Sequence, residues 1–161
     1  MQEVNLHTYH NCGLSITNYT AEPESREYDA CRFEIDGHWA IGRTAKQTPK
    51  KVGQFVTCWK RNNFGITQPY SELDDFHFFI INAKHNNRLG QFVFPKSILI
   101  AKGIVSTAKK DGKRGFRVYP IWDFPTSNIA LKTQQWQLAY FYEMDKKTDF
   151  DTVKKLFNEY K

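Results

Sequence analysis

The stretch CRFEIDGHWAIGRTAK, residues 31–46, constrains the fold more than any other part of the chain. Apolar and polar side chains alternate through CRFEI, which is the two-residue period of a half-buried strand. Asp36-Gly37 follows, and this pair favours the tight turn of a β-hairpin. The residues after it have the composition of a return strand. The stretch therefore predicts an antiparallel hairpin around which the rest of the chain must fold.

The remaining periodicity places this hairpin in a mixed fold. We predict strands over 14–19, 75–82, 90–94 and 116–120, and helices over 1–12, 96–102, 128–142 and 149–161. Strands and helices interspersed in this way imply a mixed β-sheet flanked by helices. We therefore expect an α/β (α+β) fold, built as a single domain over residues 1–161, with a central mixed sheet.

The stretch GRTAKQTPKKVGQFVTCWKR, residues 42–61, has two interpretations. Thr48-Pro49 is a typical helix start, and apolar residues at i, i+3, i+4 and i+7 from Val52 to Trp59 form a helical stripe. This pattern predicts a helix after Pro49, with the basic residues on its solvent side. The run FVTCW also suits a strand, and Gly53 disfavours a helix by about 1 kcal/mol relative to alanine.

Positive charge is concentrated in two stretches of the chain, whose formal net charge is +6. The first contains Arg43, Lys46, Lys50, Lys51, Lys60 and Arg61; the second contains Lys109, Lys110, Lys113, Arg114 and Arg117. Such stretches indicate a polyanionic partner, with DNA or RNA as the first candidate, when they meet on one face. Two separately solvated surfaces are the alternative interpretation.

Aromatic residues near the second basic stretch offer stacking surfaces. The candidates are Tyr119, Trp122, Trp136 and Tyr140. Bases stack on such rings in proteins that bind single strands. Most of the four are nevertheless expected in the core, because aromatic residues make up 16% of the chain and dominate core packing.

The sequence gives no sign of export or of a membrane span. Its first residues lack a basic start followed by an apolar run, and the longest apolar run, FHFFII, is short enough for a strand. The three cysteines are widely spaced and form no CxxC pair, so neither a disulfide framework nor a metal site is expected. We expect a cytoplasmic protein without a membrane partner or a bound cofactor.

Several segments of the chain, in this order, resemble the MepB family of small bacterial proteins. They are Glu24-Ser25 with Tyr28, AKQTPKKVGQFVTCWKR at 45–61, GQFVFPKSIL at 90–99, KGI at 102–104, GKRGFRVYP at 112–120 with Trp122-Asp123, and KTQQWQLAYF at 132–141. The resemblance implies a fold similar to that of the restriction-endonuclease-like PD-(D/E)XK nucleases, but it implies no particular reaction.

The nuclease pattern is incomplete in this chain. An active enzyme of that class needs carboxylates that hold Mg²⁺ and a lysine that stabilises developing charge. Lys46 could stand where the class has its lysine, but the acid position two residues earlier holds Thr44. Glu24, Glu34 and Asp36 are the candidates for displaced acids. Basic residues without the metal acid favour binding over cleavage.

Three hypotheses follow for the function. The first is a nucleic-acid-binding protein in which Arg43, Lys46, Lys51 and Arg117 contact phosphates, while Glu34 orients Lys46 or Arg43. The second is a Mg²⁺-dependent nuclease with Glu24, Glu34 and Lys46 as candidate catalytic residues. The third is a module that binds a protein or a small ligand.

Overall fold

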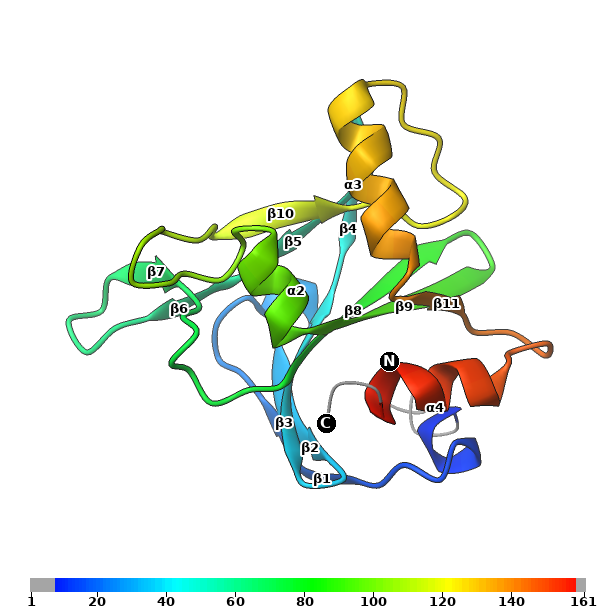
Figure 1. Ribbon diagram of the computed structural model, residues 1–161, viewed down its shortest axis with the longest axis horizontal. Coiled ribbons are helices and arrows are strands. Elements are labelled where there is room, and N and C mark those ends of the chain that lie inside the picture. The colour runs from blue at the N-terminus through cyan, green and yellow to red at the C-terminus, as the bar shows by residue number, and fades with distance from the viewer. Residues whose placement is uncertain (1–7, 159–161) are drawn as a thin grey trace.

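Figure 1 shows the computed structural model of the chain, which describes residues 8–158. Residues 8–11 form a helical turn, and the predicted elements at 1–7 and 159–161 lie outside the described residues. The following elements are β1 (Ile16–Ala21), the short 3₁₀ helix η1 (Arg26–Tyr28), β2 (Cys31–Ile35), β3 (His38–Thr44), β4 (Lys46–Thr48), β5 (Lys51–Thr57), β6 (Trp59–Arg61), β7 (Thr67–Pro69), β8 (Phe78–His85), β9 (Arg88–Pro95), α2 (Lys96–Ala101), β10 (Gly115–Val118), α3 (Asn128–Leu138), β11 (Phe141–Glu143) and α4 (Phe150–Asn158).

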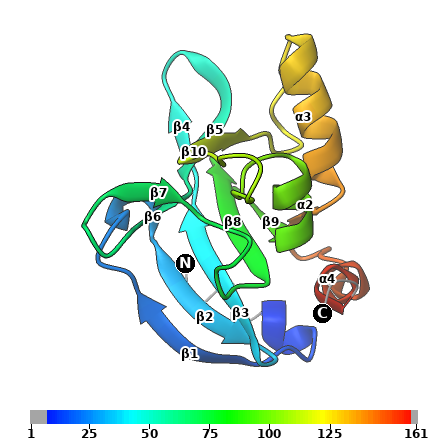
Figure 2. The ribbon, with the colours of Figure 1, turned by 60° about the vertical axis from the view of Figure 1, so that its left-hand side comes forward.

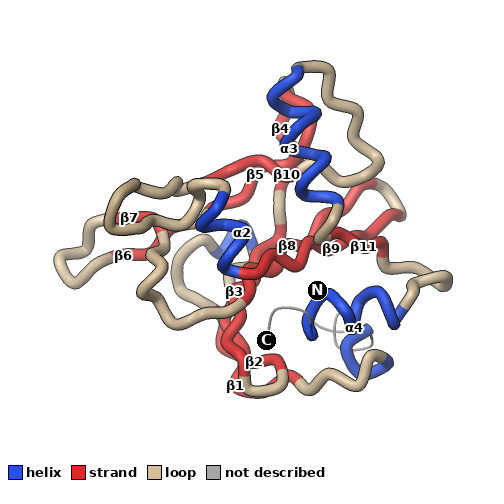
Figure 3. Tube along the Cα trace, in the orientation of Figure 1, coloured by secondary structure: helices blue, strands red, loops and turns tan. Residues whose placement is uncertain are grey.

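A six-stranded sheet in the order β1-β2-β3-β8-β9-β11 forms the centre of the molecule. Strands β3 and β8 run parallel, and every other pair in this sheet is antiparallel. Between β3 and β8 the chain leaves the sheet to form β4 to β7, and β10 later joins β5 and β4 in a smaller three-stranded sheet (Figure 3). The predicted α+β class with a central mixed sheet flanked by helices is confirmed.

The two faces of the central sheet bury separate hydrophobic clusters. One face packs against α2, α3 and the three-stranded sheet, and its cluster includes Ile41, Val56 and Phe79. The other face packs against α4 and the N-terminal helical turn, and its cluster includes Phe78 and Phe157. Figures 1 and 2 show these layers on opposite sides of the sheet. Consecutive strand residues point to opposite faces, so β3 and β8 contribute to both clusters.

The predicted hairpin over 31–46 is confirmed between β2 and β3. Its turn residues Asp36 and Gly37 have φ values of 47° and 82°. Positive φ at both central positions is typical of a type I′ turn, whose twist matches that of the flanking strands. Cys31 then pairs with Gly42 at the far end of the hairpin.

The helix predicted after Pro49 is wrong, because this stretch forms β4, β5 and β6. Thr48 pairs with Lys51, so Pro49 and Lys50 form a hairpin turn rather than the first turn of a helix. Gly53 has a φ of 85°, which a helix excludes. The apolar stripe misled because β5 carries apolar side chains on both faces: Val56 enters the core, and Phe55 lies on the outer face of the small sheet.

The helix predicted over 128–142 ends earlier, at Leu138. Residues 141–143 instead form β11 at the edge of the central sheet. Phe141 pairs with Phe92 in this edge strand, and their ring centroids lie 4.7 Å apart. Burial of this aromatic pair outweighs the continuation of the helical pattern. No helix within residues 8–158 is long and apolar enough to cross a membrane.

Candidate nucleic-acid interface

The two basic stretches of the sequence meet in the three-stranded sheet. Strand β5 pairs with β4 on one side and β10 on the other, which places Lys46, Phe55 and Arg117 in one row across the sheet. Residues paired across strands point to the same face of a sheet. The row therefore joins a lysine from the first stretch and an arginine from the second on one surface.

Helix η1 adds an aromatic ring to this surface. The ring of Tyr28 lies edge-on to Phe55, with centroids 6.3 Å apart, and the Lys46 Nζ lies 5.0 Å from the Tyr28 centroid. The hydroxyl of Thr57 donates to the hydroxyl of Ser25 at 3.0 Å and so ties η1 to β5. Both rings are partly exposed. Aromatic rings and cations thus alternate on the outer face of the small sheet.

A glycine on β10, Gly115, leaves room for the end of the Phe55 ring. A Cβ at Gly115 would lie 2.4 Å from the Phe55 Cζ, which is closer than real carbon contacts. The absence of a side chain at this position therefore determines where the ring rests. We refer to Tyr28, Lys46, Lys50, Lys51, Phe55 and Arg117 as the basic platform.

Arg117 anchors the hairpin that carries the platform lysines. Its Nε donates to the Val52 carbonyl at 3.1 Å, and its Nη2 donates to the Thr48 hydroxyl at 2.5 Å. The same nitrogen lies 3.2 Å from the carbonyls of Lys51 and Gly53. The guanidinium therefore crosslinks β4, β5 and β10. Lys50 and Lys51 extend from the anchored turn and are exposed.

A cleft of about 260 Å³ adjoins the platform beyond η1. It is lined by Glu22, Pro23, Glu24, Ser25, Arg43, Trp59, Lys60, Arg61 and Tyr70. Arg43 is only 1% exposed, and its Nη2 lies 3.1 Å from a Glu22 carboxylate oxygen and 3.2 Å from the Tyr70 hydroxyl. Burial raises the pKa of Tyr70 to about 12, so this hydroxyl stays protonated at neutral pH.

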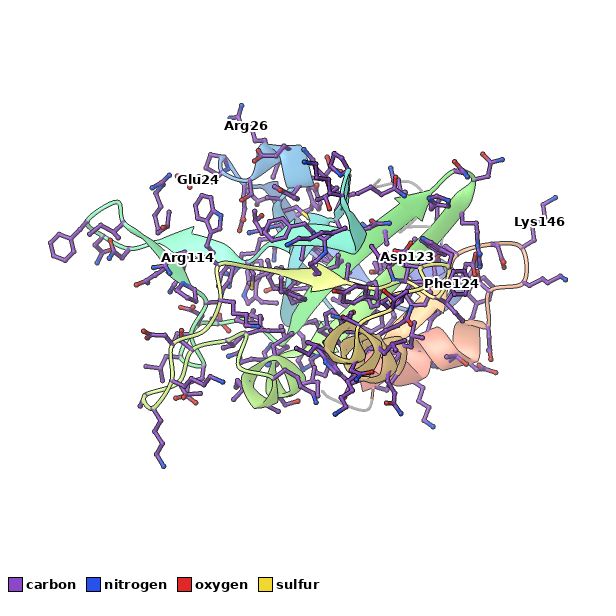
Figure 4. The ribbon with its side chains drawn as sticks, turned by 90° about the horizontal axis from the view of Figure 1, so that it is seen from above. Glu24, Arg26, Arg114, Asp123, Phe124 and Lys146 are labelled. Atoms are coloured by element: carbon purple, nitrogen blue, oxygen red, sulfur yellow. The ribbon has the colours of Figure 1, made fainter. Side chains whose placement is uncertain are left out.

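The other cations of the cleft also face carboxylates. Arg61 pairs with Glu24, and Lys60 pairs with Asp74. Figure 4 shows Glu24 on the same side of the molecule as Arg114, at the start of β10, whereas Lys146 lies at the opposite end. Fixed positive and negative charges therefore balance within this cleft, in contrast to the lysine-rich platform beside it.

The donor set of the cleft does not fit Mg²⁺. A catalytic magnesium ion needs carboxylates whose charge is available to it. Glu22 and Glu24 each face an arginine instead, and Asp36, in the turn before β3, accepts a hydrogen bond from the Ser15 amide at 2.9 Å. Within residues 8–158 no group of three or more His, Cys, Asp or Glu side chains is arranged to hold a metal ion.

Comparison with known proteins identifies the family. A family model described as MepB-like matches residues 22–143, which span the platform, the cleft and the central sheet apart from β1. The chain belongs to the MepB-like family. The resemblance seen in the sequence is thereby confirmed, and it includes Tyr28, the β4–β5 hairpin and β10.

Two solved structures are similar to this MepB-like chain. The crystal structure of MepB shares 33% sequence identity with a TM-score of 0.80, covering 91% of this chain and 100% of that chain. A bacterial homing endonuclease, I-Ssp6803I, shares 14% identity with a TM-score of 0.48, covering 85% and 86% of the two chains. No curated protein matches the sequence.

The residues predicted to contact nucleic acid are divided between the platform, the cleft and the frame of this MepB-like protein. Lys46, Lys50 and Lys51 are exposed on the platform, and Lys113 is exposed in the loop before β10. The remaining members are anchored: Lys60 and Arg61 pair with acids in the cleft, Arg114 donates to the Thr67 carbonyl at 3.0 Å, and Arg117 clamps the hairpin. Arg43 is buried, so its predicted contact with a surface phosphate does not agree with its position.

The role predicted for Glu34 as the residue that orients a basic side chain is also wrong. Its carboxylate accepts hydrogen bonds from Thr17 at 3.1 Å and Asn18 at 2.9 Å, both on β1. Glu34 pairs with Trp39 near the start of β3, whereas Lys46 follows the end of that strand. The part of β3 from Trp39 to Thr44 alone separates the two levels by roughly 16 Å. The acid and the lysine therefore do not form one site.

Sequence reasoning missed two residues that complete the cleft, Glu22 and Tyr70. Glu22 lies in an acidic, polar segment, and Tyr70 lies in a segment without periodicity. Both reach Arg43 only because β1 pairs with β2, and because the chain returns to the sheet through residues 70–77. No local signal marks such a contact. The quoted segment with Glu24, Ser25 and Tyr28 was the one indication that this region contributes to a site.

Proposed function

We propose that this chain binds single-stranded nucleic acid on the basic platform. The observation that carries the proposal is the pairing of β5 with both β4 and β10, which unites the two basic stretches. On the same face lie the partly exposed rings of Tyr28 and Phe55. This surface has the two components that single-strand binding requires, namely cations for the phosphates and rings for the bases.

The exposed lysines are suited to contact phosphates. Lys50 and Lys51 stand at the tip of an anchored hairpin, and Lys46 lies beside an aromatic ring. Each phosphate neutralised releases condensed counterions, which makes binding weaken as salt rises. An unpaired base can leave its stack to contact Tyr28 or Phe55, whereas a base inside a duplex cannot. We therefore expect tighter binding to single strands than to duplexes.

The arginines have a supporting part in this proposal. Arg117 holds the hairpin through four oxygen contacts, and Arg114 attaches the β6–β7 hairpin to the start of β10. In the neighbouring cleft, the acidic side chains form ion pairs with basic side chains and do not form a set of metal ligands. The arrangement favours binding without cleavage.

Fluorescence anisotropy of labelled single- and double-stranded DNA and RNA, repeated over a salt series, tests the proposal. The variant Lys50→Ala/Lys51→Ala removes two phosphate contacts. The negative slope of log K against log salt should therefore become less steep by about 1.4 for a single strand. Lys154→Ala/Lys155→Ala on α4 is the matched control, because both lysines are exposed and α4 covers the opposite face of the central sheet. Equal loss in both variants, or no binding at low salt, would overturn the proposal.

A cleavage assay with Mg²⁺ separates binding from nuclease activity. The binding proposal predicts that a bound labelled strand stays intact with and without Mg²⁺. Cleavage that is abolished by Glu24→Gln would instead assign a catalytic role to the cleft, and would contradict our interpretation of its paired charges.

A further inference from the structure

A second pocket, of about 350 Å³, lies along the free edge of β10 between the end of α2 and α3. Figure 1 shows these three elements converging above the central sheet. The lining includes Lys102, Lys113, Tyr119, Thr133 and Trp136, and no acidic residue of the described chain lines it. Apart from Arg117, the pocket shares no residue with the platform. Its volume lies in the range of small-ligand sites.

Two glutamines fix the wall of this pocket. The fully buried amide of Gln137 accepts from the Tyr119 N–H at 2.8 Å and donates to the Arg117 carbonyl at 2.9 Å, as a neighbouring strand would. Gln134 donates to the carbonyls of Pro120 at 3.0 Å and Asp123 at 2.8 Å. These bonds attach α3 to the end of β10. The pocket is therefore formed before any ligand arrives, which lowers the entropy lost on binding.

The pocket offers an aromatic surface next to two cations. Trp136 is half-buried, and its ring is held against Phe94 with centroids 5.4 Å apart. The Lys102 Nζ lies 5.5 Å from the Trp136 ring centroid. Lys113 reaches the same pocket from the loop before β10, and both lysines are exposed. A ligand that satisfies both features carries a flat ring system and an anionic group.

We propose that this pocket binds one nucleotide, with its base against Trp136 and its phosphate between Lys102 and Lys113. An indole ring stacks on any base, and two ammonium groups without a nearby carboxylate attract a phosphate. The nucleotide has two possible sources, a free mononucleotide or one residue of a strand. Only the second source rests on the function proposed above.

Titration calorimetry with adenosine monophosphate tests the site directly. We expect saturable binding of this nucleotide, and at least about tenfold weaker binding of adenosine, of ribose 5-phosphate and of inorganic phosphate. Binding of inorganic phosphate as tight as that of the nucleotide would reduce the pocket to a general anion site and overturn the proposal. So would the lack of any saturable binding of adenosine monophosphate.

Paired lysine variants locate the phosphate. Lys102→Ala/Lys113→Ala should weaken nucleotide binding at least about tenfold. Lys109→Ala/Lys132→Ala is the matched control, because these exposed lysines come from the same loop and from α3 but do not line the pocket. Trp136→Leu should abolish the preference for the nucleotide over ribose 5-phosphate. Equal weakening by the test pair and the control pair would show that net charge, and not this pocket, attracts the ligand.

Competition with a labelled oligonucleotide assigns the source. Displacement of the strand by adenosine monophosphate, together with weaker strand binding in Lys102→Ala/Lys113→Ala, would support a strand residue as the occupant. Saturable nucleotide binding without displacement would support a free mononucleotide. The pocket proposal and the platform proposal can fail independently. Lys50→Ala/Lys51→Ala tests the platform alone, because it should weaken strand binding and leave binding of adenosine monophosphate unchanged.

Discussion

The platform and the cleft lie side by side and both are rich in cations, but they differ in how those cations are compensated. In the cleft, Arg43, Lys60 and Arg61 each face a carboxylate. On the platform, Lys46 lies against a tyrosine ring, and the hairpin tip carries Lys50 and Lys51 into solvent. The comparison teaches that a basic stretch of sequence separates in the fold into charges that build the structure and charges that remain available.

The division follows the chemistry of the two side chains. A guanidinium presents five donors in a rigid plane and can satisfy several acceptors at once. Arg43 contacts a carboxylate, a carbonyl and a hydroxyl, and Arg117 contacts three carbonyls and a hydroxyl. A lysine has a flexible stem and a strongly hydrated charge, which suits it to an exposed phosphate contact.

The largest effect is expected for Arg43→Met. This change removes one partner of an almost buried ion pair and leaves Glu22 without its counter-charge. Breaking such a pair destabilises a protein by about 3–5 kcal/mol. Urea unfolding followed by circular dichroism measures the loss. Arg61→Met is the control in the same cleft, because both side chains of its pair are about half exposed, and its loss should stay below about 1 kcal/mol. Similar losses of unfolding free energy for both variants would contradict the distinction between charges that build the structure and charges that remain available.

A smaller effect is expected on binding when a platform ring is removed. Phe55→Ala should weaken binding of a single strand by about 1–3 kcal/mol, because one stacking surface is lost. Binding of a duplex should change less, since its bases do not reach the ring. Tyr19→Ala is the control, because Tyr19 is exposed and stacks on Phe33 away from the platform. Anisotropy measurements that show equal losses for single strand and duplex would contradict base stacking on Phe55.

Arg117→Lys keeps the charge of the platform but removes the fork that anchors the hairpin. We expect a loss of about 1–2 kcal/mol in the free energy of unfolding, because several hydrogen bonds to the hairpin are lost. Amide hydrogen exchange should accelerate in β4 and β5. Lys51→Arg, which also keeps the charge, should leave both quantities unchanged. Unchanged amide hydrogen exchange in Arg117→Lys would mean that Arg117 does not anchor the hairpin and that its charge remains available to a ligand.

The smallest effect concerns an acid near the platform. Burial raises the pKa of Asp123, and His85 and Arg117 only partly oppose this rise. A raised folded-state pKa means that the stability contribution is fully present below the unfolded pKa and is lost as pH rises through the folded pKa. Asp123→Asn should therefore raise the melting temperature at neutral pH by about 1–2 °C. The gain should vanish near pH 3. A decrease at neutral pH would mean that Arg117 stabilises this carboxylate more than burial destabilises it.

Local patterns in the sequence predicted the central sheet well. The β2–β3 hairpin was expected because alternation and turn residues act over a few positions, and the strands at 75–82 and 90–94 were expected from their apolar runs. The stretch after Pro49 was predicted wrongly because its partner strand, β10, lies about sixty residues away. Without that partner, four apolar residues at helical spacing fit either structure.

The candidate site was predictable only in part. Charge alone predicted the exposure of Lys46, Lys50 and Lys51, but Lys50 and Lys51 lie at a hairpin tip and not on the predicted helix. The burial of Arg43 was not predictable, because it depends on Glu22, which follows β1. Nor could the sequence distinguish Trp136, which lines a pocket, from Trp122, which is buried. Such distinctions depend on tertiary contacts, which produce no periodic pattern in the sequence.

The position of β10 in the chain has a consequence for biosynthesis. Strands β4 and β5 leave the ribosome before β10. The three-stranded sheet is therefore complete only when residue 118 has also emerged. During that interval Arg117 is not yet present to clamp the hairpin, and one edge of β5 has no partner strand. Pairing at this sequence separation is slow compared with local folding. The nascent protein therefore acquires its lysine-bearing surface late, after the β2–β3 hairpin and the β8–β9 pair have emerged.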